Sequence, residues 1–322
     1  MNYVIRRLFT FPLVMFGVSA VVFVSIRLVP GDAITAMLGT EAGLLTTAQR
    51  EALAHYFGLD QTWLVQYGRW IAGLFHGDLG LSYTFGRPVL EIILERFPNT
   101  LELAILSIAL ALLIGIPAGI AAARVKDSRA DLIIRLCAMI GQSTPNFVFA
   151  LLVILLLSAG FGVLPQMGEF RPLWADPLGN LMQMILPSLT LGLAFAASIT
   201  RVVRASMVER LRDDYIRTAR AKGVPERRVV WFHALPNSLI PVLTLCGVEF
   251  GYLLGGAVLV EQIFALPGIG RLVLDAILQR DYALVEGVVL FAALNVMIVN
   301  LLIDLAYANL DPRIRFEQGR PS

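Results

Sequence analysis

Charged residues are scarce in this chain of 322 residues. They make up 16% of it, against roughly 25% in an average soluble domain, while the hydrophobic set makes up 57%. A soluble domain of this length needs a charged shell that this composition does not supply, so we expect the chain to lie mainly in lipid. The formal net charge of +2 says little about an acidic partner, and no nucleic acid is expected.

Residues that commonly build metal or catalytic sites are also few. The two cysteines, Cys137 and Cys246, fall within apolar runs without paired spacing, so we interpret them as packing residues. The three histidines are scattered, which argues against an enzyme. No Gly-x4-Gly-Lys-Ser/Thr loop occurs, so ATP is expected to bind elsewhere. We therefore predict no catalytic residue, metal or cofactor on this chain.

Long apolar runs, by contrast, are abundant. About 20 helical residues cover the roughly 30 Å hydrocarbon core, because each residue rises about 1.5 Å. Six windows meet this length: Leu8 to Leu28, Leu101 to Ala123, Leu132 to Gly160, Leu181 to Arg201, Leu239 to Val260 and Leu284 to Tyr307. We predict an all-α, polytopic membrane helix bundle of about six transmembrane helices, the first an uncleaved signal anchor.

Basic residues indicate the orientation of these windows. Of the 26 lysines and arginines, 18 fall in the terminal segments and in the loops after the second and fourth windows, and 8 fall on the opposite side. Because basic residues stay in the cytoplasm, both termini are predicted to be cytoplasmic.

The most basic loop, 207–236, has an ordered sequence. The pair Asp213-Asp214 suits the start of a helix, and Gly223 suits the left-handed residue that follows one. Pro225 suits the first turn of a second helix, which should end before Leu235-Pro236 because proline disfavours a helical residue in front of it. The sequence predicts two short helices that meet at Gly223.

A simple topology anchor explains the charge of this loop but not its internal order. The order resembles the coupling loop of permease subunits in ATP-binding-cassette importers, which reads Glu-Ala-Ala, three residues, Gly, nine residues, then Ile-x-Leu-Pro. Residues 217–219 occupy the first triplet, and Ala219, Gly223 and Leu235-Pro236 match. Arg217, Thr218 and His233 depart from the general pattern, and the stretch 214–223 resembles the dipeptide, oligopeptide and nickel permeases.

Other marks of that family stand in order along the chain. They are Val-Pro-Gly-Asp at 29–32, Gly-Leu-Asp at 58–60, Gly-Asp-Leu-Gly at 77–80, Asn-Thr-Leu-Glu-Leu at 99–103, Leu-Pro-Gly-Ile-Gly at 266–270 and Leu-Asp-Pro-Arg at 310–313. The resemblance implies the fold of a type I importer permease. It also implies a location in the cytoplasmic (inner) membrane of a bacterium or archaeon.

The resemblance further implies partners and a coupling site. A second homologous permease, two ABC ATPase subunits that bind ATP and Mg²⁺, and an external substrate-binding protein would complete the transporter. The expected coupling residues are Tyr215, Ile216, Arg217, Thr218, Ala219, Arg220, Lys222, Gly223, Leu235 and Pro236. The basic members are expected to pair with carboxylates of the ATPase groove, and Tyr215, Ile216 and Ala219 to form the apolar contact.

Three parts of the chain are expected. Residues 1–98 carry the first transmembrane helix and an external scaffold segment, 99–310 form the transmembrane core with the coupling loop, and 311–322 form a cytoplasmic tail. The aromatic residues of the external segment suit either an interfacial belt or a surface for the binding protein.

Polar side chains within the spans are costly in lipid and usually face an interior. The candidates for a translocation path are Gln142, Asn146, Glu249 and Asn295. The carboxylate of Glu249 either lines the path or pairs with a helix of the partner permease. Di- or oligopeptides lead as substrates and nickel follows, since the resemblance covers both. A secondary transporter or channel, which needs no ATPase, is the remaining alternative.

Overall fold

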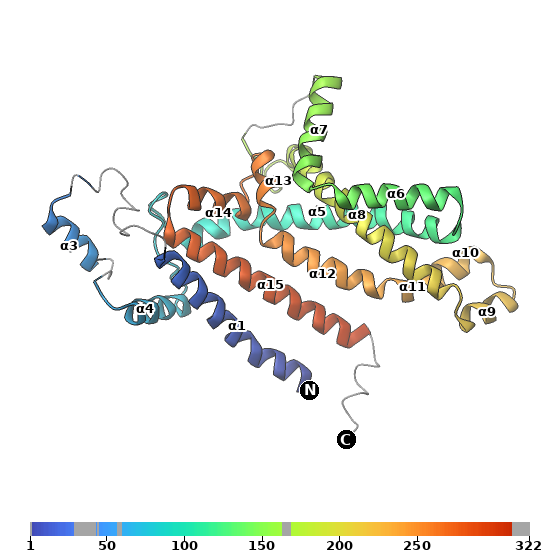
Figure 1. The fold of residues 1–322 in the computed structure, drawn as a ribbon, viewed down its shortest axis with the longest axis horizontal. Helices are drawn as coiled ribbons and strands as arrows, with labels where there is room; N and C mark the ends of the chain where they lie inside the picture. Colours follow the sequence, from blue (N-terminus) through green and yellow to red (C-terminus); the bar gives the residue numbers. More distant parts are fainter. Residues whose placement is uncertain (1, 29–42, 44, 57–59, 163–168, 311–322) are drawn as a thin grey trace. The chain divides into compact units, whose positions relative to one another are not determined.

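The computed structural model describes residues 2–28, 43, 45–56, 60–162 and 169–310. Helices dominate these residues, and no β-strand occurs among them (Figure 1). The helices are α1 (Asn2–Arg27), α3 (Thr47–Tyr56), α4 (Trp63–Phe75), α5 (Val89–Arg124), α6 (Arg129–Ser143), α7 (Asn146–Phe161), α8 (Pro177–Arg210), α9 (Asp214–Ala221), α10 (Glu226–Arg228), the π-helical turn η2 (Val229–Ala234), α11 (Leu235–Ser238), α12 (Ile240–Leu254), α13 (Val258–Ile263), α14 (Ile269–Leu278) and α15 (Tyr282–Leu310).

Four of the described helices are long and apolar enough to cross a membrane: Thr10–Arg27 of α1, all of α5, all of α8 and Tyr282–Ile303 of α15. Two bent pairs bring the number to six if each is one span. They are α6 with α7, and Glu226–Ser238 with α12. The predicted all-α membrane bundle is confirmed, while the side on which the termini lie remains a prediction.

The third predicted span is broken. The axes of α6 and α7 differ by 103°, and Thr144 and Pro145 separate the two helices. Both residues have extended backbones, with ψ of 120° and 138°. The window 132–160 is therefore divided into two helices at Pro145, because a residue before proline leaves the helical region for steric reasons.

The fifth predicted span is shorter than expected. The helix α12 ends at Leu254, and the Gly255-Gly256 pair separates it from the short helix α13. The φ angle of Gly256 is +101°, a conformation that a residue with a Cβ atom rarely adopts. The apolar run to Val260 therefore belongs to two helices, which hydropathy alone does not reveal.

One compact unit comprises residues 1–98 and 267–298. Its core combines apolar residues from both segments: Val89, Ile92, Ile93, Ile269, Leu272, Ala276, Leu284 and Val288. Polar contacts join the same segments. The hydroxyl of Ser82 donates to the buried carboxylate of Asp281 at 2.5 Å, and Arg27 pairs with Glu286 at 2.9 Å. Segments far apart in the sequence thus fold together here.

The second compact unit comprises residues 99–266 and 299–322, of which the last twelve lie outside the described residues. Its core gathers Ala111, Ile120, Ile199, Val203, Met207, Ile216, Val229, Val230 and Ala234. The loop that follows α8 is thus packed onto the helices of this unit. The division of the chain at 98, 310 and 322 proposed from the sequence stays a prediction.

Close approach of α5 and α8 depends on glycine. A Cβ atom on Gly119 would lie 2.6 Å from the Cβ of Val203 and 2.8 Å from the carbonyl oxygen of Thr200. Small residues at such crossings allow helix backbones to pack closely, as expected for a membrane bundle.

We expect Gly119→Ala to lower the free energy of unfolding by about 1 to 3 kcal/mol, because the added methyl meets backbone that is held in a helix. Gly160→Ala is the matched control, since no described atom lies within 4 Å of its added Cβ. Thermal unfolding of the purified chain in detergent measures both. Equal melting temperatures for the two variants would contradict the close crossing.

Candidate functional site

The first short helix of the loop, α9, ends in a Schellman motif. The N–H of Gly223 donates to the carbonyl of Arg220 at 2.9 Å, and the N–H of Val224 donates to that of Ala219 at 3.2 Å. The φ angle of Gly223 is +75°. The left-handed glycine predicted after the first helix is confirmed.

The surroundings of Gly223 are open. A Cβ atom added there would meet no described atom of this chain within 4 Å. Glycine is therefore required by the backbone conformation and not by crowding within the chain. The space next to Gly223 is thus left open by the described part of this chain.

The second helix does not end before Leu235-Pro236 as predicted. It begins after Pro225 as α10, widens into the π-helical turn η2 and continues as α11 to Ser238. The N–H of Leu235 donates to the carbonyl of Val230, five residues earlier. The wider turn accommodates Pro236, which lacks an N–H and whose ring would clash with the carbonyl of residue 232 in a regular α-helix.

Two of the predicted contact residues are buried within this chain. Ile216 is fully buried in the core of its unit, among residues such as Val229 and Met207, and Leu235 is buried in the same cluster. Ala219 packs against that cluster too. The expectation that Ile216 forms an apolar contact with a partner is corrected, because amphipathic α9 uses this residue to attach itself to the core.

The Gly223 corner is closed by an ion pair. The guanidinium of Arg220 donates to both carboxylate oxygens of Glu226, at 3.0 and 2.7 Å, and joins α9 to α10. These bonds raise the pKa of Arg220 and hold the pKa of Glu226 below its usual range. Arg220 is thus engaged within the chain, which the sequence did not reveal.

The remaining loop candidates lie at the surface. Tyr215 donates its hydroxyl to the carbonyl of His233 at 3.4 Å, and Thr218 donates to the carbonyl of Asp214 at 3.0 Å. Arg217 pairs with Asp214 at 3.1 Å. Lys222 and Pro236 are exposed as well. The exposed face of α9 therefore presents Tyr215, Arg217, Thr218 and Lys222.

The candidates for a translocation path belong to both compact units of the chain. Gln142 and Asn146 flank the 103° break between α6 and α7. Glu249 lies within α12, half-buried, and makes no hydrogen bond or ion pair with another described residue. Asn295 belongs to the other unit and donates its amide to the carbonyl of Phe291 on its own helix, at 2.8 Å.

Sequence reasoning missed a buried ion pair at the start of α6. Asp131 is fully buried and accepts from Nε and Nη2 of Arg204 on α8, at 2.5 and 2.6 Å. Asp131 also accepts from the N–H of Asp127 at 3.1 Å. Such pairing is invisible in one sequence, because the partners are 73 residues apart. Among the described residues, no group of three His, Cys, Asp or Glu is placed to hold a metal ion.

Solved structures share this arrangement of helices. A methionine ABC transporter, MetNI, in an inward-facing conformation gives a TM-score of 0.56 at 16% identity, over 69% of this chain and 97% of that one. An amino acid ABC transporter with histidines gives 0.50 at 18% identity, over 68% and 94%. The fold of this chain is thus shared with these two ABC transporter structures.

The family follows from sequence. Residues 115–316 match the binding-protein-dependent transport system inner membrane component, and residues 1–104 match the N-terminal segment of such membrane components. The chain belongs to this family of permeases, and its place is the inner membrane.

Individual relatives cover nearly the full length. A putative peptide transport system permease protein of Brucella abortus is 41% identical over 304 residues, 94% of this chain and 96% of its own length. The oligopeptide transport system permease protein AppB of Bacillus subtilis is 39% identical, over 98% and 99%. The glutathione transport system permease protein GsiC of Escherichia coli K12 is 40% identical, over 98% and 100%.

Proposed function

We propose that this chain is one permease subunit of an ATP-driven importer that carries di- or oligopeptides across the cytoplasmic membrane of a bacterium. The observation that carries this proposal is identity of about 40% over nearly the whole chain to permeases named for peptide, oligopeptide and glutathione transport. All three names describe substrates with peptide bonds, which favours peptides over nickel.

In this proposal the chain moves substrate and does no chemistry. ATP and Mg²⁺ bind two partner ABC ATPase subunits, a second homologous permease completes the pathway, and an external binding protein delivers the peptide. The exposed face of α9 and the Gly223 corner meet one ATPase. The Arg220–Glu226 pair supports this role, because it holds the two short helices at a defined angle for a mechanical contact.

Reconstitution tests the proposal. The chain is placed in proteoliposomes with the partner permease and ATPases encoded in the same genome, and with the binding protein outside. We expect uptake of labelled di- or tripeptides only when ATP is inside and the binding protein is present. Uptake of Ni²⁺ in place of peptides would show that nickel is the substrate. Uptake without any ATPase would indicate a secondary transporter.

A further inference from the structure

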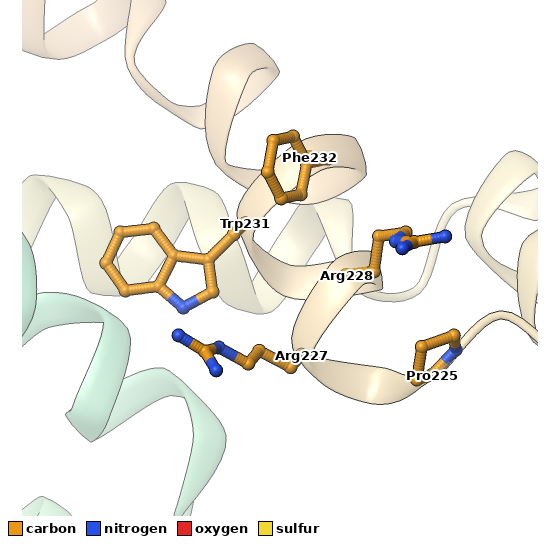
Figure 2. Close-up of a pocket in the computed structure, with 5 residues that line it drawn as sticks. All are labelled: Pro225, Arg227, Arg228, Trp231 and Phe232. Atoms are coloured by element: carbon orange, nitrogen blue, oxygen red, sulfur yellow. The ribbon is translucent and has the colours of Figure 1, made fainter.

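A pocket lies on the loop, next to the coupling corner but formed by other side chains. Pro225, Arg227, Arg228, Trp231 and Phe232 line a cavity of about 610 Å³ (Figure 2). This volume is within the range of small-molecule sites. We refer to these five residues as the aromatic-basic pocket. Neither the transport mechanism proposed above nor the coupling contact uses it.

The pocket lies on the exposed face of the turn η2, and the opposite face of this turn packs into the core of its unit. Val229, Val230 and Ala234 are buried, whereas Trp231 is 44% exposed and Phe232 is 74% exposed. Both large aromatic side chains belong to the π-helical turn η2 and lie on its exposed face. Adjacent exposed aromatics of this size are costly in water and indicate a surface that something apolar covers.

The charge of the pocket is uncompensated by the described part of the chain. Arg217 and Arg220 each have a carboxylate partner nearby. Arg227 and Arg228 form no ion pair with any described residue. In Figure 2 the guanidinium of Arg227 extends toward the indole of Trp231, while that of Arg228 extends away from it. A guanidinium that no carboxylate of the described chain neutralises is suited to an anion, and above all to phosphate.

The pocket lies a short way before the candidate spanning helix α12 in the sequence. Phe232 precedes Ile240, the first residue of the spanning helix α12, by eight residues, which is about 12 Å along a helix. The segment Glu226–Ser238 is bent by 50° from α12, so it departs from the direction of that helix. Tryptophan and arginine next to the end of an apolar span are typical of the headgroup region of a membrane.

We propose that the aromatic-basic pocket binds the headgroup of an anionic phospholipid. Arg227, beside Trp231, donates hydrogen bonds to the lipid phosphate, and Arg228 adds positive charge on the other side of the pocket. Trp231 and Phe232 lie against the glycerol and the first carbons of the acyl chains. Apolar and cationic groups side by side match a ligand that is itself half apolar and half anionic. The proposal rests on α12 crossing a membrane and not on the identity of the transported substrate.

Native mass spectrometry on the full-length chain, purified with its co-purifying subunits, tests this site. The probe is phosphatidylglycerol, titrated against phosphatidylcholine. We expect the protein to retain phosphatidylglycerol preferentially, and the double variant R227Q/R228Q to weaken that preference on the order of tenfold. R227K/R228K should keep part of it, because lysine retains the charge but not the forked geometry. Arg212 is exposed on the same loop but belongs neither to the pocket nor to the expected coupling residues, so R212Q is the matched control and should bind as the unaltered chain does.

Three results would overturn the proposal. One is unchanged retention of phosphatidylglycerol in R227Q/R228Q. The second is competition by free inorganic phosphate as strong as that by the lipid, which would make the pocket a site for a soluble anion. The third is loss of the co-purifying ATPase from R227Q/R228Q while lipid retention persists, which would assign the face to a protein partner.

Discussion

Substitution of Gly223 by valine is expected to abolish ATP-dependent uptake while the protein still inserts into the membrane. The φ angle of +75° places residue 223 in the left-handed region, where a β-branched side chain is strongly disfavoured. The Schellman hydrogen bonds that join residues 219 and 220 to 223 and 224 would then break, and the angle between α9 and α10 would change. Because both short helices anchor in the core through Ile216 and Val229, the spans themselves should remain in place.

The variant Gly223→Asn separates the effect of the backbone conformation at residue 223 from the effect of a side chain on the surface there. Asparagine tolerates the left-handed conformation, and the space around residue 223 within the described chain is open. If the turn alone matters, the asparagine variant should retain most of the uptake. If a partner packs closely over the corner, both variants should lose it.

The measurement is uptake together with ATP hydrolysis in the reconstituted complex. An uncoupled transporter hydrolyses ATP without uptake, or no longer responds to the binding protein. Normal coupled uptake by Gly223→Val would remove the Gly223 corner from the mechanism, even if the chain remains a permease.

Removal of one partner from the Asp131–Arg204 pair is expected to have the largest effect on stability. Arg204→Met leaves the fully buried carboxylate of Asp131 without its bidentate donor, and breaking a buried pair in this way costs about 3 to 5 kcal/mol. Arg135, at 3.5 Å and partly exposed, replaces little of that contact. The helices α6 and α8 should separate at this end at lower temperature.

Two variants control for the charge itself. The double variant D131L/R204M removes both charges and should recover most of the loss, because no buried ion is left unpaired. R217M breaks the exposed pair with Asp214 and should cost about 1 kcal/mol or less. Melting temperatures of the purified proteins in detergent rank the stabilities of these variants. Arg204→Met as stable as R217M would show that the pair does not hold these helices together.

The sequence alone predicts those features that depend on only a few neighbouring residues. Gly223 predicts its own left-handed turn, since glycine is the residue that adopts a positive φ angle without steric cost. The apolar runs predict the spans, because a helix must satisfy every backbone polar group inside lipid. Hydropathy alone does not locate the ends of the helices at Pro145 and at Gly255-Gly256. At both places a break in the backbone divides an apolar run that hydropathy treats as continuous.

Contacts between distant residues were not predictable from this sequence. Ile216 and Tyr215 are neighbours in the polar helix α9, yet one is fully buried and the other exposed, because the packing of α9 onto η2 and α8 selects the buried face. Arg220 and Arg227 are both loop arginines. Only the folded corner shows that the first is neutralised by Glu226 and that the second faces outward with the aromatic residues.

By itself, the sequence determined that this chain is a helical membrane protein with a helix-Gly-helix loop, because hydropathy and backbone preference act over a few residues. The tertiary structure decided which loop residues remain available to partners, which charges are paired and where the spans break. Burial and ion pairing depend on segments that are distant in the chain and come together only when the helices pack.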